Sequence, residues 1–215
     1  MTKDTVPTGV DATGAAASDT REPAPRRQRS DARRNIDSLL EAALAVFGPS
    51  GVDAPAKEIA DRAGVGVGTL YRHFPKRSDL VKAVFQREVD ACAEAAPALA
   101  AGHEPGVALE RWLLRYTEFL ATKRGLASAL HSGDPAFDAL PDYFMQRLGP
   151  ALGSLLDAAV AADEIRADIG PKELLFAVSK LCLPVSDEGA ADGERMVGLL
   201  VDGLRHGAGS RRSRS

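Results

Sequence analysis

The sequence contains no run of 18 or more apolar residues, which is the length that a membrane-spanning helix needs. Its N-terminus also lacks the apolar stretch of a secretory signal, so we expect a cytoplasmic protein without a membrane partner. Aromatic residues make up only 5% of the 215 residues, although 45% are hydrophobic. Alanine, leucine and valine must therefore fill most of the core. Since alanine and leucine are strong helix formers, this composition favours helices.

The signatures of catalytic and metal sites are also missing. There is no phosphate loop, no Gly-x-Ser-x-Gly elbow and no His-Glu-x-x-His motif, and the four histidines are scattered. We therefore expect no enzymatic activity, no cofactor and no bound metal. The two cysteines, Cys92 and Cys182, do not form a Cys-x-x-Cys pair. Their apolar surroundings favour two buried thiols in a reducing compartment, and a redox pair is the alternative.

Positive charge is concentrated in one part of the chain. The net charge is −3, but residues 26–90 hold twelve Lys and Arg against nine Asp and Glu, so the remainder is acidic. This asymmetry suits a DNA-reading domain attached to an acidic one. We predict a disordered arm over residues 1–29 and a flexible basic tail over residues 207–215, because both have few large apolar side chains. The basic end of the arm is either solvated or in contact with DNA.

Between these tails the apolar residues recur with a helical period, and no strand pattern is evident, which predicts an all-α fold. Ser30 or Asp31 can cap the first helix, and a run of Gly and Pro over residues 48–51 ends it. Further helices are expected over residues 55–63, 67–74, 77–95, 109–125, 126–131, 140–162, 172–185 and 192–206. Pro97 is expected to follow the end of the fourth helix and Gly149-Pro150 to kink or break the long one, with residues 98–104 as a linker.

The second and third helices have the pattern of a helix-turn-helix. Gly64 can adopt a positive φ and so allows a sharp turn between them. The side chains expected to pack inward are Ile59, Ala60, Ala63, Val65, Val67, Leu70 and Phe74. In this construction the second helix enters the major groove of DNA. We therefore predict a DNA-binding domain over residues 30–76.

The outward residues of the third helix include groups suited to nucleic acid. Thr69, Tyr71 and His73 can hydrogen-bond phosphates, and Arg72 can reach a guanine edge or a phosphate. Gly66 and Gly68 are small and allow DNA to approach closely. An ordinary surface helix is the alternative interpretation.

The run from Gly64 to Pro75, with its Gly-Thr-Leu-Tyr-x-His-Phe core, resembles the signature of the tetracycline-repressor (TetR) family. The resemblance extends from about Arg33 to Phe85 and implies an operator-binding transcriptional regulator. It implies phosphate contacts by Tyr71 and His73, with Thr69 beside them. It implies further DNA contacts for Arg33, Gly66, Val67, Gly68, Arg72, Lys76 and Arg77. The serine that usually caps this helix is replaced by Gly66. The stretch from Trp112 to Ala127 is similar to an actinobacterial subgroup.

For residues 77–206 the resemblance implies a helical domain that binds a small-molecule effector and forms a homodimer. Candidate pocket residues are His103, Trp112, Tyr116, Phe119, His131, Phe137, Phe144, Met145 and Phe176, although each aromatic can equally be a core residue. Candidate dimer-interface residues form two apolar stripes, Leu174, Leu175, Val178, Leu181 and Cys182, and Met196, Val197, Leu200, Val201 and Leu204. A dimer predicts a near-palindromic double-stranded operator.

Three functions remain open at this point. The first is a repressor that a small molecule releases from DNA through the fourth helix. The second is a ligand-independent, DNA-organising member of the same family with a collapsed effector domain. The third is an enzyme, which would need polar residues clustered in a cavity.

Overall fold

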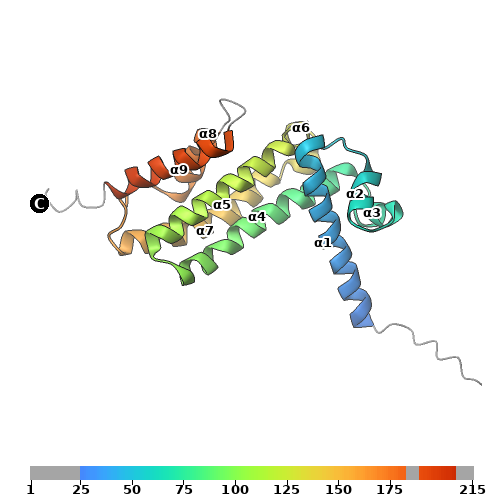
Figure 1. Cartoon of the computed structure of the whole chain (residues 1–215), viewed down its shortest axis with the longest axis horizontal. Helices are drawn as coiled ribbons and strands as arrows, with labels where there is room; N and C mark the ends of the chain where they lie inside the picture. Colours follow the sequence, from blue (N-terminus) through green and yellow to red (C-terminus); the bar gives the residue numbers. More distant parts are fainter. Residues whose placement is uncertain (1–24, 183–188, 207–215) are drawn as a thin grey trace, which may run out of the picture.

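The computed structural model describes residues 25–182 and 189–206, and within these ranges it contains only helices and the turns between them. The predicted all-α fold is confirmed. Three helices form a small head, comprising α1 (Pro25–Ser50), α2 (Ala56–Arg62) and α3 (Val67–His73). The remaining helices form a larger body that begins with α4 at Arg77, and the head lies at one end of it (Figure 1). No described helix is both long and apolar enough to cross a membrane.

The head folds much as its sequence predicts. Leu39, Phe47 and Ile59 are fully buried between α1 and α2. Gly64 has a φ of +70°, which a side chain would disfavour, and it joins α2 to α3. The expected start of α1 is wrong, because the helix begins at Pro25 rather than near Ser30. Proline fits the first turn of a helix, and the arginines and glutamine that follow are good helix formers, so the predicted arm is too long by five residues.

The body is built on α4 (Arg77–Gly102), α5 (Pro105–Gly125) and α7 (Leu140–Ala161), which pack side by side (Figure 1). A short α6 (Ala127–Leu130) and a 3-10 turn, η1 (Pro135–Phe137), connect α5 to α7. The expected end of α4 near Ala95 is wrong, since the helix continues through Pro97 to Gly102. The proline is exposed and alanines flank it, so their helix propensity outweighs one lost hydrogen bond. Similarly, α7 is continuous through Pro150.

Two further helices, α8 (Pro171–Leu181) and α9 (Gly189–Arg205), cover the body at the side away from α3 (Figure 1). The predicted extension of α8 to Val185 lies outside the described residues. Six of the predicted dimer-interface residues are buried within the protomer: Leu174, Leu175, Val178, Val197, Val201 and Leu204. They pack inward, so the prediction of an outer face is wrong for these six. Leu181 is exposed, and Cys182, Met196 and Leu200 are half-buried.

The head touches the body at a second place besides the start of α4. Gly125, the last residue of α5, lies against the end of α1, and a Cβ there would be 3.1 Å from the Phe47 carbonyl oxygen. Glycine allows this close approach of two backbones. The Arg77 guanidinium lies 5.7 Å from the centre of the Phe47 ring and donates a hydrogen bond to the Ala54 carbonyl. Both contacts attach the head to the body.

Candidate nucleic-acid interface and ligand cavity

The two sides of α3 differ in burial. Leu70 and the following Phe74 face the core of the head and are 3% and 8% exposed. On the opposite side Tyr71 is 53% exposed and Arg72 is also exposed, while Thr69 is half-buried. An exposed tyrosine and arginine on a helix that is anchored by buried apolar residues can donate hydrogen bonds to phosphates and base edges.

The other predicted contact residues are mostly exposed. Gly66, Gly68, Lys76 and Arg33 are exposed, and Val67 is half-buried. Gly66 caps α3 without any side-chain hydrogen bond, as expected from the missing serine. A Cβ at Gly66 or Gly68 would meet nothing within 4 Å, so the surface there is open.

His73 has a feature that the sequence does not show. Its ring is half-buried, and its Nε2 atom is buried without a hydrogen-bond partner among the described residues. A buried polar atom without a partner costs about 1–3 kcal/mol. In the free protein this ring nitrogen therefore contributes no hydrogen bond to the stability of the fold.

Arg77 lies differently from its prediction. Its guanidinium is directed toward the Ala54 carbonyl and the Phe47 ring, so it packs within the protein. The exposed cation at this turn is Lys76, whose backbone N–H donates to the Asp79 carboxylate at 3.0 Å and so starts α4. Lys76 is therefore the more accessible of the two cations at this turn.

A cavity of about 330 Å³ opens between α4, α5, α7 and α8. It is lined by Phe85, Tyr116, Leu120, Lys123, Leu130, His131, Phe137, Leu140, Pro141, Phe144, Met145, Phe176 and Ser179. Six of these were candidate pocket residues from the sequence: Tyr116, His131, Phe137, Phe144, Met145 and Phe176. The size and the mostly apolar lining are typical of small-molecule sites.

The structure places three candidate pocket residues elsewhere. Phe119 lies behind the wall, with its ring 6.0 Å from that of Tyr116. Trp112 is fully buried beneath Tyr116 and donates its Nε1 hydrogen to the Cys92 carbonyl at 2.9 Å. His103 follows the far end of α4, where its Nε2 atom lies 3.1 Å from Arg111. Helical spacing indicates which face a residue occupies but not what lies opposite it.

Lys123 is the chemically most informative lining residue that the sequence interpretation missed. It follows Tyr116 by seven residues and Leu120 by three, so it lies on the same face of α5. That spacing was the available signal. The side chain is half-buried, and burial lowers the pKa of its ammonium group below the ordinary value.

The cysteines are both reduced in the structure. Burial raises the pKa of the Cys92 thiol to about 12, so this thiol is not reactive at neutral pH. Cys182 is only half-buried, whereas the sequence predicted that both would be buried.

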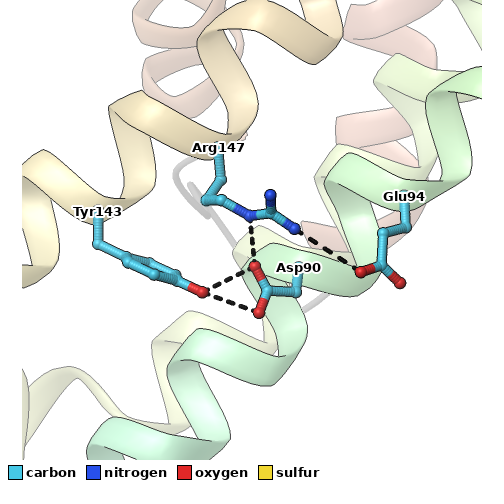
Figure 2. Close-up of polar contacts among 4 residues, drawn as sticks. All are labelled: Asp90, Glu94, Tyr143 and Arg147. Atoms are coloured by element: carbon cyan, nitrogen blue, oxygen red, sulfur yellow. Dashed lines mark hydrogen bonds and ion pairs between the residues drawn. The ribbon is translucent and has the colours of Figure 1, made fainter.

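A polar cluster joins α4 to α7 close to the cavity (Figure 2). The Tyr143 hydroxyl lies 2.8 Å from both carboxylate oxygens of Asp90, and Arg147 Nε donates to the same carboxylate at 2.6 Å. The Arg147 guanidinium also lies 3.6 Å from Glu94. Because Phe144, next to Tyr143 on α7, lines the cavity, this cluster connects the cavity wall with the helix that leads to the head.

We expect Asp90→Ala to lower the free energy of unfolding by only about 1 kcal/mol, because partly exposed ion pairs contribute little. Urea denaturation followed by circular dichroism measures this difference. Glu94→Ala is the matched control, since its carboxylate is 74% exposed and makes only the longer contact, and it should change stability by less. Equal losses of stability for both variants would contradict the expectation that the contacts of Asp90 contribute more than the contact of Glu94.

Known proteins resemble both parts of the chain. Residues 39–84 match the model of the bacterial regulatory proteins of the tetR family, and residues 104–206 match the SbtR-like transcriptional regulator C-terminal domain. An HTH-type transcriptional regulator of Staphylococcus aureus is 43% identical over 63 residues, which are 29% of this chain and 34% of that protein. The chain thus spans about a third of the length of the curated relatives it matches.

Solved structures extend the similarity over most of the chain. A TetR transcriptional regulator from Streptomyces coelicolor is 36% identical, with a TM-score of 0.67, over 79% of this chain and 98% of that one. A TetR regulatory protein from Mycobacterium vanbaalenii is 35% identical, with a TM-score of 0.66, over 83% and 99% of the two chains. Given these matches, the chain belongs to the TetR family of transcriptional regulators.

Proposed function

We propose that this protein is a dimeric, cytoplasmic repressor that binds a near-palindromic operator through α3 and leaves it when a small molecule occupies the cavity. The observation that carries the proposal is the exposure of Tyr71 and Arg72 on a helix held in place by Leu70. Tyr71, Thr69 and His73 would donate hydrogen bonds to phosphates. Arg72 and the residues at the start of α3 would contact the base edges.

The head and the body would have separate functions. The head, residues 25–76, would bind DNA, and the body, residues 77–206, would bind the effector and form the dimer. Arg26, Arg27 and Arg29, which lie in the first turns of α1, remain candidates for additional DNA contacts, as predicted from the sequence.

The proposed dimer uses the outer sides of α8 and α9. Leu181 and Leu199 are 43% and 59% exposed and belong to the few large apolar side chains on the described surface. A two-fold axis through this surface would bring the same patch of both protomers together.

We expect the double substitution Leu181→Glu with Leu199→Glu to produce monomers, because burying unpaired carboxylates in the interface costs several kcal/mol. Light scattering after gel filtration measures the mass. Val107→Glu is the matched control, since Val107 is an exposed apolar residue on α5 and 38% exposed. A double variant that keeps the dimer mass would contradict this interface.

A movement of α4 would transmit ligand binding in the cavity to the head and so release the DNA. This helix begins beside α3 at Arg77 and contributes Phe85 to the cavity wall. A ligand that binds one position of α4 better than another shifts the population of head positions. The open cavity favours this mechanism over a ligand-independent family member.

The decisive experiment is a gel shift with the DNA upstream of the protein's own gene, repeated over a series of salt concentrations. We expect retention of that DNA and a steep loss of affinity with salt, because phosphate neutralisation releases counterions. DNA retention that does not change with salt would contradict phosphate contacts by α3, and absence of retention would contradict the choice of operator region.

A further inference from the structure

The cavity has an unusual balance of charge. Most of its lining is aromatic or aliphatic, and no carboxylate belongs to it. Besides the Tyr116 hydroxyl, its polar side chains are Lys123, His131 and Ser179. The lining thus contains a lysine but no acidic side chain, and the rest of the wall suits an apolar molecule.

Three of these polar groups have partners inside the protein. Ser179 donates its hydroxyl hydrogen to the Leu175 carbonyl at 2.8 Å, and the Tyr116 hydroxyl donates to the same carbonyl at 3.3 Å. Nδ1 of His131 lies 2.8 Å from the Ala127 carbonyl, which can only accept, so this nitrogen carries the hydrogen. None of the three needs a ligand to satisfy its donor.

Lys123 is different, because no hydrogen bond or ion pair engages its ammonium group within the described part of the chain. Burial alone lowers its pKa, and no carboxylate opposes that effect. A half-buried cation without a counterion is costly, and an anion placed beside it would recover the lost interaction energy. The carboxylate of a ligand is the simplest group that supplies this charge and hydrogen-bond acceptors.

The volume limits the size of such a ligand. A cavity of about 330 Å³ lies at the lower end of the range for small-molecule sites, so it favours a small ligand. If the polar end of such a ligand reaches Lys123, then Phe144, Met145 and Phe176 would contact its apolar part.

We propose that the effector is an apolar monocarboxylate whose carboxylate pairs with Lys123 and whose hydrocarbon part lies against the aromatic wall. This inference rests on the proposed function, because it names the chemical class of the effector. Related acids share this chemistry, whether their hydrocarbon part is a straight chain or an aromatic ring.

The test compares decanoate with 1-decanol, which share a ten-carbon chain and differ in charge. The sole tryptophan, Trp112, stacks on Tyr116 at 5.8 Å between ring centres, so its fluorescence can report binding, and calorimetry gives an independent affinity. At pH 7 we expect the wild-type protein to bind decanoate at least about tenfold more tightly than 1-decanol.

Lys123→Met keeps the length of the side chain and removes its charge. We expect it to weaken decanoate binding about tenfold and to leave 1-decanol binding within about twofold. Lys172→Met is the control for net charge, because Lys172 is exposed on α8 and does not line the cavity. It should bind both probes as the wild type does.

Three results would overturn the inference: equal affinity of the wild type for both probes, no binding of either probe, or an unchanged preference in Lys123→Met. If that variant does not fold, the comparison of the two probes on the wild type decides alone. A parallel gel shift separates the two proposals. Decanoate binding with retained DNA would contradict effector-driven release but support the carboxylate site, whereas DNA binding without decanoate binding would overturn only the carboxylate site.

Discussion

Tyr71→Phe combined with His73→Ala is expected to lower operator affinity at least about a hundredfold. Hydrogen bonds to charged groups are worth about 1.5–3 kcal/mol each, and each 1.4 kcal/mol is a factor of ten. The double variant would remove two such bonds to phosphates from each protomer of the dimer. Gel shifts or fluorescence anisotropy at one fixed salt concentration measure the change.

Folding should survive these substitutions. Tyr71 is 53% exposed, and the buried Nε2 of His73 has no partner, so no hydrogen bond within the described protein is broken at that atom. The thermal unfolding midpoint therefore serves as a control. Tyr143→Phe is the matched control for loss of a tyrosine hydroxyl, because it lies on α7 in the Asp90 cluster (Figure 2). If the double variant binds the operator as tightly as the wild type, the assignment of the DNA surface is wrong.

Trp112→Ala is expected to lower the free energy of unfolding by about 3–5 kcal/mol, as is usual for removal of a large core aromatic. The side chain is fully buried and stacks on Tyr116, and its Nε1 donates an additional hydrogen bond to the Cys92 carbonyl. Its removal deletes this hydrogen bond and creates a void in the core. Since native proteins are stable by only about 5–15 kcal/mol, this loss would remove a large fraction of the total stability.

Urea denaturation followed by circular dichroism measures the effect, because this variant has no tryptophan. Trp112→Phe keeps an aromatic ring and loses mainly the hydrogen bond, so it should cost clearly less. A loss below about 1 kcal/mol for Trp112→Ala would instead indicate that the site can collapse around a smaller side chain, and would contradict its assignment to a tightly packed core.

The sequence predicted the helix-turn-helix well because its signals are local. Pro55 and Pro75 restrict the backbone, and Gly64 permits the positive φ of the turn. As expected, α2 begins after Pro55 and ends before Gly64, and α3 ends before Pro75. Pro97 and Pro150 look the same in the sequence, yet α4 and α7 pass through them. In these helices packing over many turns stabilises the helix more than one proline destabilises it.

The body was harder to predict for a different reason. An apolar stripe must be buried, but its spacing does not reveal whether the same chain or a second protomer covers it. Leu174 and Val197 are covered within the protomer, where the sequence had suggested a partner. Lys123 was missed because a lysine near the end of a helix usually faces solvent, and only the fold reveals the cavity beside it.

The close approach of Gly125 to Phe47 restricts how the head can move. Arg77, where α4 begins, contacts the ring of the same phenylalanine, so α4 and α5 both meet the head at Phe47. A shift of α4 relative to α5 would therefore act on the head at this one residue. In the proposed dimer, the distance between the two α3 helices would then depend on how far α4 moves against α5.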